Sequence, residues 1–433
     1  MLEALERQAP SDRYQHWDEL SHGEEHGGIS HEATWAALKM VRRARERRLG
    51  PGGRREFGYG VPEGLDDLLH SVDRTGVGEV AGADLAERLE ASVLLREAVA
   101  SAALAGAKVG LEAGREMLRA GRPPAGAGER MVWNLAGTLR DLRGRGSGPL
   151  TREFLVEMNR RITAGTVEPP EAAGRLRREG EGAAGVEAEA AGFYDPPPAR
   201  ELPARLDALC RFANDAAAEP FIHPLIRAIA LHFWLAYDRP FVDGNGRTAR
   251  VLFYWAMARA GYPLFTYVSL SSPLAAAPRR YARAFLATES DGNDLTYFLL
   301  HQAEAIRAGL RAARERRARK QAEVEAGARQ SRVFPLLNRR QQAVVAHALR
   351  APDARYGIAR HQHSHGVTHQ TARDDLFDLV RRDLLTVTRE RRVYVFRPAE
   401  GLPARLHAAS GLRRRPRGGR TVAADEGLPT SLL

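Results

Sequence analysis

The sequence predicts a mainly α-helical fold, followed by a small C-terminal module that ends in a β-hairpin. Two stretches, residues 225–237 and 248–260, repeat apolar side chains at helical spacing. A second group of helical patterns begins near residue 333 and is followed by two alternating runs that indicate strands. The chain has 433 residues, of which 44% are hydrophobic and 27% charged, so it is long enough for two or three globular domains.

Further helical patterns place helices along most of the chain before residue 321. In order, they cover residues 35–48, 65–73, 85–106, 129–143, 151–163, 278–289 and 295–321. Residues 1–55 are expected to be a small N-terminal helical element with Trp17 and Trp35 packed inside it. Residues 311–332 are expected to be a charged helical linker.

The stretch between the two apolar helices, residues 238–250, reads DRPFVDGNGRTAR. Pro240 ends the first helix, because proline cannot continue one. Gly244 and Gly246 allow backbone shapes that are closed to other residues and let amide groups approach a ligand. Those amides open the second helix, where the helix dipole favours an anion.

Two arginines and a carboxylate complete this loop. Arg247 and Arg250 lie three residues apart on one helix face and can contact phosphate oxygens. Asp243 offers hard oxygen ligands that suit Mg²⁺. The pattern predicts a phosphate-binding loop, while the plain alternative is a helical hairpin with solvated arginines.

The same string resembles the signature of the Fic (Fido-domain) family, H-P-F-x-D/E-G-N-G-R-x-x-R, and departs from it at the first position alone. The resemblance covers residues 56–310 and implies a helical Fic fold with a small β-hairpin flap. It implies transfer of AMP from ATP to a Ser, Thr or Tyr hydroxyl of an unknown target protein, with Mg²⁺ held by Asp243. The implied ATP-binding residues are Asp243, Gly244, Asn245, Gly246, Arg247, Thr248, Arg250 and Tyr281.

Arg239 stands where the family has its catalytic histidine. Imidazole can accept a proton near neutral pH, whereas a guanidinium stays protonated and has no acceptor. We therefore expect AMP transfer to be weak or lost. His232 lies seven residues upstream, about 10 Å along the helix, and is expected to be a hydrogen-bonded core residue. His223 is expected to start that helix.

A second departure concerns the inhibitory helix that family members of this type carry, with the motif S/T-x-x-x-E-G/N. The matching segment lies in the expected helix 85–106, where Ser101 and Gly106 fit the motif and Ala105 replaces the glutamate. Without that glutamate, Arg250 is expected to be unpaired. The flap region, residues 174–200, has Val186 as its one β-branched residue, so a flexible loop is an equal alternative there.

Residues 333–398 predict a winged helix-turn-helix: helices at 336–349, 356–362 and 368–385, then strands at 386–389 and 393–397. Thr368 is expected to cap the recognition helix, in which apolar residues at 372, 376, 379, 380 and 384 form a stripe at helical spacing. DNA is the expected partner, with protein docking as the alternative. His361, His363 and His365, in the expected turn before the recognition helix, also invite a metal interpretation, which no accompanying carboxylate or cysteine set supports. The candidate DNA-binding residues are Thr368, His369, Gln370, Thr371, Arg373, Arg391 and Arg392.

Charge and cysteine content limit the remaining choices. Residues 301–433 hold 27 Lys and Arg against 13 Asp and Glu, a balance of +14 within a chain of +11, which favours a polyanionic partner there. Residues 411–433 are expected to be a disordered basic tail. The single cysteine, Cys210, is expected to be a packed thiol, and no apolar run is long enough for a membrane helix, so a cytoplasmic location is expected.

Three functions remain open at this point. The first is a Fic-type AMP transferase of reduced activity. The second is a nucleotide-binding pseudoenzyme that regulates through its winged domain. The third is an intact transferase in which Arg239 positions a phosphate and substrate or solvent supplies the base. The oligomeric state is open as well, with a homodimer as one alternative.

Overall fold

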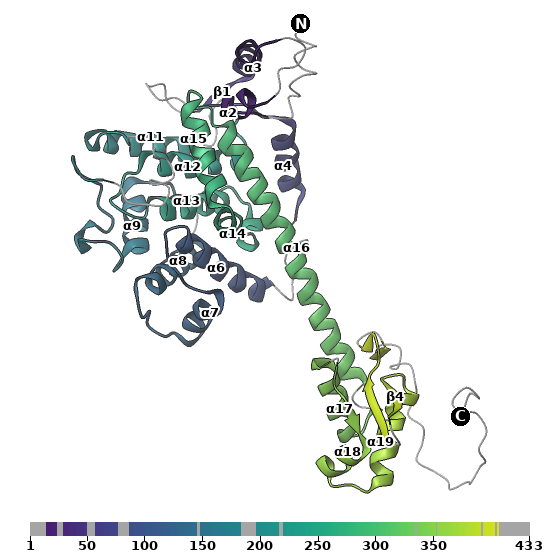
Figure 1. The fold of residues 1–433 in the computed structure, drawn as a ribbon. Coiled ribbons are helices and arrows are strands. Elements are labelled where there is room, and N and C mark those ends of the chain that lie inside the picture. Colours follow the sequence, from purple (N-terminus) through teal and green to yellow (C-terminus); the bar gives the residue numbers. More distant parts are fainter. Residues whose placement is uncertain are drawn as a thin grey trace. The chain divides into compact units, whose positions relative to one another are not determined.

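The chain divides into two compact units, Met1–Arg317 and Ala318–Leu433 (Figure 1). Each unit has its own cluster of buried apolar side chains. The computed structural model describes residues 14–23, 29–49, 57–76, 86–144, 148–182, 196–215, 220–333, 336–351, 353–390, 393–402 and 405–406.

The first unit opens with two short helices and a two-stranded antiparallel sheet. Helices α2 (Trp17–Ser21) and α3 (His31–Arg45) pack through an edge-to-face contact between Trp17 and Trp35, whose ring centroids are 6.0 Å apart. Strand β1 (Arg47–Leu49) pairs with β2 (Phe57–Tyr59). The helix expected to run to residue 48 therefore ends at residue 45, because pairing with β2 satisfies the backbone beyond it and buries Leu49.

The helices of the first unit match most of the sequence patterns to within a few residues. Its helices are α4 (Glu63–Arg74), α6 (Ala86–Ala103), α7 (Leu111–Ala120), α8 (Ala127–Gly144), α9 (Arg152–Thr163), α11 (Leu202–Asn214), α12 (Pro224–Asp238), α13 (Asn245–Arg259), α14 (Ser271–Ala276), α15 (Pro278–Ser290) and α16 (Thr296–Val333), with 3₁₀ turns η2 (Pro170–Ala172), η3 (Ala199–Glu201) and η4 (Pro263–Tyr267). Helices α7 and α14, which no sequence pattern indicated, are additions.

Helices α12 and α13 form the centre of this unit and pack against each other (Figure 1). Every residue of α12 from Leu225 to Asp238 is buried. Phe233 stacks on Phe285 of α15, with ring centroids 5.1 Å apart, and meets Phe57 of β2 edge to face. Cys210 of α11 is buried in the same core, where burial raises the pKa of its thiol to about 11, so the expected packed thiol is confirmed.

The described part of the flap region touches the loop that follows α12. Leu176 forms an antiparallel bridge with Phe241, and the Arg177 amide donates to the Pro240 carbonyl at 2.9 Å. Residues 183–195, which include Val186, lie outside the described residues. Backbone pairing between this region and the loop is thus present at its start.

The second unit combines helices with a three-stranded antiparallel sheet of order β3-β5-β4. Its described elements beyond α16 are α17 (Arg339–Arg350), β3 (Tyr356–Gly357), α18 (Ile358–His365), α19 (His369–Arg381), β4 (Leu385–Glu390) and β5 (Val393–Pro398). The core includes Ala372, Leu376 and Leu379, the helical stripe that the sequence indicated. Phe396 of β5 is fully buried. Its ring meets that of Phe377 of α19 edge to face, with the ring centroids 5.2 Å apart.

Three expectations for this unit need correction. Residues 356–357 are a strand paired with β5 rather than the start of a helix. The helix expected over 368–385 ends at Arg381, because Asp383 adopts a left-handed conformation (φ 57°) and Leu385 begins β4. His361, His363 and His365 lie within helix α18 and not in a turn.

No helix within the described ranges combines the length and the apolar character needed to span a bilayer. Arg391 and Arg392 and the basic tail at 411–433 lie outside the described residues.

Candidate functional site

The loop between α12 and α13 makes two left-handed turns. Arg239 ends α12 with φ 43° and ψ 59°, and Gly244 precedes α13 with φ 79°. Residues other than glycine rarely adopt this left-handed backbone conformation, and holding one there costs roughly 1–3 kcal/mol. Arg239 is therefore a strained position at the start of the loop, fixed in part by Arg177, whose Nε donates to the Arg239 carbonyl at 2.8 Å.

Phe241 and Asn245 fix the middle of the loop. The Phe241 amide donates to Asn245 Oδ1 at 2.9 Å, and Asn245 Nδ2 donates back to the Phe241 carbonyl at 2.8 Å. The Phe241 side chain is fully buried. The asparagine thus closes the turn on itself, and the phenylalanine anchors it in the core.

Helix α9 supplies a polar support that the sequence did not reveal. Asn159 is buried and donates to the Asp243 carbonyl at 3.0 Å and to Thr248 Oγ1 at 3.1 Å. It also accepts from the Gly174 amide at 3.1 Å. Its one sequence signal was a polar residue on the apolar face of an amphipathic helix. A Cβ at Gly244 would lie 2.5 Å from Thr163 Cγ2, so glycine is required for this close approach as well as for its φ.

Asp243 and Arg247 form the charged pair of the loop. Arg247 Nη2 donates to Asp243 Oδ2 at 2.6 Å, and the Gly244 amide donates to Asp243 Oδ1 at 2.5 Å. Arg247 is 2% exposed, and in the described part of the chain its Nη1 is buried without a hydrogen-bond partner. Among the described residues, no side chain caps the start of α13. A buried guanidinium donor and an open helix start together suit an anion.

Arg250 does not stand unpaired, as the sequence led us to expect. Its Nε donates to Ser101 Oγ at 2.9 Å and its Nη2 to the Ser101 carbonyl at 3.1 Å. The arginine is 1% exposed. Ala105 and Gly106 follow the end of α6 in a turn where Gly106 has φ 86°. The expectation was wrong because a buried guanidinium needs partners, and the serine one turn before Ala105 provides them.

The histidines and the tyrosine near the loop have structural contacts. His232 Nε2 shares a hydrogen bond of 2.8 Å with Tyr281 Oη, and both side chains are buried. Burial lowers the pKa of His232 well below its ordinary value, and the nearby Arg250 adds to the effect. His223 caps α12 by accepting from the Leu225 amide at 3.1 Å. Both histidines have the expected roles, and Tyr281 has the contacts of a core residue.

In the second unit, the start of α19 is open to solvent. Thr368, His369, Gln370 and Arg373 are exposed and Thr371 is half-buried, with Thr368 capping the helix by accepting from the Thr371 amide. Asp375 faces inward and accepts from Arg340 Nε at 2.6 Å and His361 Nε2 at 3.2 Å. In the described ranges, no group of three or more His, Cys, Asp or Glu side chains is placed to hold a metal ion.

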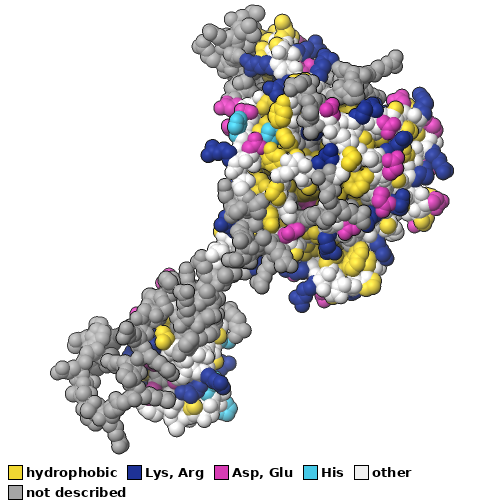
Figure 2. Space-filling model, turned by 180° about the vertical axis from the view of Figure 1, so that it is seen from behind, with side chains coloured by type: hydrophobic (Ala, Val, Ile, Leu, Met, Phe, Trp, Pro, Cys, Tyr) yellow, Lys and Arg dark blue, Asp and Glu magenta, His cyan; other side chains and the backbone are white. Residues whose placement is uncertain are grey.

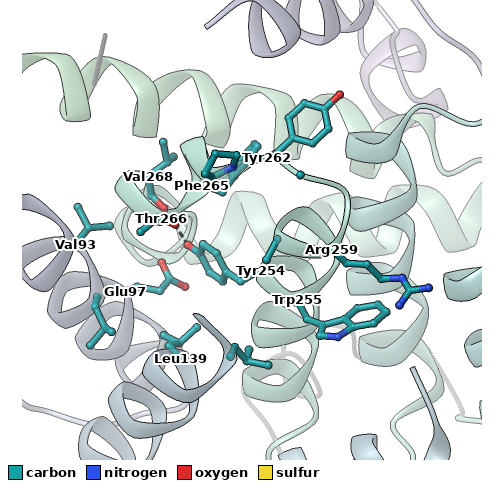
Figure 3. A pocket seen from close by; sticks show the side chains of 15 residues that line it. Val93, Glu97, Leu139, Tyr254, Trp255, Arg259, Tyr262, Phe265, Thr266 and Val268 are labelled. Atoms are coloured by element: carbon teal, nitrogen blue, oxygen red, sulfur yellow. Dashed lines mark hydrogen bonds between the residues drawn. The ribbon is translucent and has the colours of Figure 1, made fainter. Parts of the chain in front are cut away.

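A cavity of about 420 Å³ lies apart from the loop, between α6, α8, α13 and η4 (Figure 3). Its wall is mostly apolar, and Glu97 and Tyr254 point toward each other within it. Glu97 is buried and accepts from Ser269 Oγ at 2.8 Å and the Ser271 amide at 2.9 Å. No residue of 239–250 lines this cavity, so it is separate from the loop between α12 and α13. Figure 2 shows basic and acidic side chains interspersed over the visible face of the first unit.

Residues 149–257 match the sequence profile of the Fic/DOC family, and this range contains the whole loop. This segment has a Fic/DOC-type sequence. It is similar to "Protein adenylyltransferase Fic" of Drosophila melanogaster and of Drosophila sechellia, each 33% identical over 114 residues, or 26% of this chain. The match spans about a fifth (21%) of the length of those relatives.

One solved structure extends the likeness in fold beyond the Fic segment. A Fic family protein from Desulfovibrio desulfuricans G20 aligns with a TM-score of 0.50 and 18% identity, over 79% of this chain and 97% of that chain. At this identity the likeness concerns the fold alone. The helices around the Fic segment, including α6, therefore belong to a Fic-like helical fold, and the chain is distantly related to protein adenylyltransferases.

Proposed function

We propose that this protein binds Mg-ATP at the loop of residues 239–250 (the Fic loop). The rest of the Fic-like fold would be a protein adenylyltransferase scaffold whose AMP transfer is weak or lost. The observation that carries the proposal is Arg247, a buried guanidinium at the start of α13. Within the described ranges its Nη1 has no hydrogen-bond partner and no side chain caps the helix. Leaving such a donor unsatisfied costs about 1–3 kcal/mol. A phosphate oxygen would satisfy it, and the adjoining amides would share the charge.

Asp243 is the residue that would hold Mg²⁺. Its two oxygens accept from the Gly244 amide and Arg247 Nη2, so one of these contacts would be exchanged for the ion. The carboxylate is 22% exposed and can be reached by a ligand. When bound, Mg²⁺ would offset the negative charge of the phosphates.

Arg239 is the reason to expect little transfer. AMP transfer to a hydroxyl needs a group that removes the hydroxyl proton, and a general base contributes about 10²–10⁴-fold. The guanidinium has no acceptor. His232 is buried against Tyr281 and His223 caps α12, so neither is placed to substitute. The competing possibility is a transferase in which Arg239 positions a phosphate and the substrate or solvent accepts the proton.

The test compares the wild-type protein with Arg239→His in the presence of Mg²⁺ and ATP labelled on its α-phosphate. We expect calorimetric ATP binding by both proteins, and self-labelling or target labelling by the variant alone. Asp243→Asn in the Arg239→His background is the control and should abolish the labelling. Strong labelling by the wild type would refute the loss of activity, and absence of ATP binding by both would refute the phosphate site.

A second function, DNA binding by a C-terminal winged helix-turn-helix, is favoured by the exposed start of α19. Thr368, His369, Gln370 and Arg373 are the residues placed to contact base edges. Asp375 and Asp378, which would oppose an anion, point instead to Arg340 and Arg382. The +14 charge of residues 301–433 would supply phosphate contacts.

The DNA proposal is tested by a filter or fluorescence assay at two salt concentrations. Binding should weaken steeply with salt, and Arg373→Ala should weaken it more than Arg381→Ala, a matched change at the other end of α19. Equal binding by a chain that lacks residues 330–433 would contradict the proposal. In that case protein docking becomes the better account of this unit.

A further inference from the structure

A second cavity of the first unit lies between α14, α15 and α16, away from the Fic loop. Its volume is about 620 Å³, and none of residues 239–250 lines it. The inner wall is formed by small apolar side chains, among them Leu274, Ala277 and Ala308. Gly309 lets α16 approach closely, since a Cβ there would lie 2.8 Å from Val268 Cγ1. Part of the cavity lining is therefore apolar.

The rim of this cavity is strongly basic. Four arginines line it, Arg280, Arg307, Arg311 and Arg316, against one carboxylate, Glu304, which leaves a formal balance of +3. Arg280 Nη2 pairs with Glu304 at 2.9 Å. Like charges that converge on one cavity repel each other, and an anion that enters it removes that repulsion.

In the described part of the chain, Arg307 and Arg311 have no carboxylate partner. Arg307 donates to the Gly64 carbonyl, and Arg316 Nη2 donates to the Tyr267 carbonyl at 3.2 Å. Carbonyl acceptors orient a guanidinium and leave its charge in place. Arg311 is exposed at the rim. Arg307 and Arg311 therefore present positive charge beside the apolar part of the lining.

We propose that this cavity binds an organic phosphate, with the phosphoryl groups on the arginine rim and an apolar or aromatic body against the alanine-rich part of the lining. Guanidinium groups match phosphate oxygens in geometry and charge. A volume of about 620 Å³ lies within the ordinary range of small-molecule sites. The site is distinct from the Fic loop and does not depend on AMP transfer.

The location gives such a ligand access to the contacts that hold α6. Ser269 and Ser272 line the cavity, and their hydroxyls are 2.7 Å apart. Ser269 Oγ also donates to Glu97 of α6, one turn before Ser101, which holds Arg250 of the Fic loop. A ligand in the cavity would therefore change the contacts of α6, the helix whose Ser101 binds Arg250.

The experiment uses the full chain, ADP and inorganic pyrophosphate as probes, and His301 as a local reporter. His301 lines the cavity, and its imidazole signal is identified by NMR from its loss in His301→Gln. We expect ADP to shift this signal in the wild type and equally in Arg247→Gln, which removes the loop's phosphate contact. Pyrophosphate should bind at least tenfold more weakly than ADP, because it has no apolar or aromatic group to contact the alanine-rich part of the lining.

Two charge reversals decide whether the rim is the site. Arg311→Glu should weaken ADP binding at least tenfold, while Arg283→Glu, an exposed residue of α15 outside the cavity, should change it less than twofold. Equal effects of the two reversals would overturn the proposal, because they would show general charge attraction. An unchanged His301 signal at millimolar ADP, or a shift that Arg247→Gln abolishes, would overturn it too.

Discussion

Arg250 on α13 and Ser101 on α6, 149 residues apart in the sequence, are joined by a hydrogen bond of 2.9 Å between Nε and Oγ. A second bond runs from Arg250 Nη2 to the Ser101 carbonyl. The pair places the end of α6 directly on the second arginine of the Fic loop. Arg250 was expected to be unpaired because Ala105 replaces the glutamate of the motif, but the hydroxyl and the backbone carbonyl of Ser101 are its partners.

Ser101→Ala should therefore destabilise the first unit. The substitution removes the acceptor of a buried guanidinium donor, which costs about 1–3 kcal/mol. Chemical denaturation of the full chain measures the change. Ser71→Ala, at an exposed serine of α4 whose hydroxyl has no hydrogen-bond partner among the described residues, is the control and should stay within about 0.5 kcal/mol. If the two variants unfold alike, the Arg250–Ser101 bond contributes nothing to stability.

Gly244→Ala should be more destabilising than Gly261→Ala, although the two glycines have almost the same backbone. Their φ angles are 79° and 80°, so both alanines incur the left-handed penalty of about 1–2 kcal/mol. Only at Gly244 does the new Cβ meet neighbours, with Thr163 Cγ2 at 2.5 Å, which adds roughly 1–3 kcal/mol. Thermal or urea denaturation of both variants separates the two contributions, and equal losses would contradict the close approach.

Acid should destabilise the first unit well before its carboxylates are protonated. Burial, helped by Arg280, lowers the pKa of His301 from 6.5 to about 4, and burial lowers that of His232 as well. The unfolded chain then binds protons that the folded chain does not. The contribution of the neutral histidines to the free energy of unfolding is complete above pH 6.5. It falls as the pH drops toward 4, by on the order of 3 kcal/mol for His301. The slope of stability against pH should be smaller in His301→Gln, and an unchanged slope would contradict this origin.

In the second unit, Asp375→Ala should loosen the packing of α17 on α19, while Asp374→Ala should not. Asp375 is buried and accepts from Asn338, Arg340 and His361, so its loss leaves three donors without an acceptor and costs about 3 kcal/mol. Asp374 is exposed and contacts Gln370 alone among described residues. Hydrogen exchange of α17 and α19 amides in the full chain measures the difference, with α12 amides as the internal reference.

Much of the fold was predictable because it depends on local patterns. The apolar stripe of α19, the caps His223 and Thr368, and the burial of α12 follow from residues within a few positions of one another. Strands β1 and β3 were missed because they are two or three residues long and exist only through pairing with distant partners. A short strand has no periodicity of its own, so its sequence carries little signal.

The sequence by itself determined the chemistry of the loop: two glycines, a carboxylate and two arginines in order, and Arg239 in place of an imidazole. Only the tertiary structure decided what those groups touch. Asn159 supports the loop from α9, Ser101 holds Arg250 from α6, and Arg247 keeps a buried Nη1 without a partner among the described residues. The reason is that residue type sets which bonds a side chain can make, while packing of distant helices sets which of them it does make.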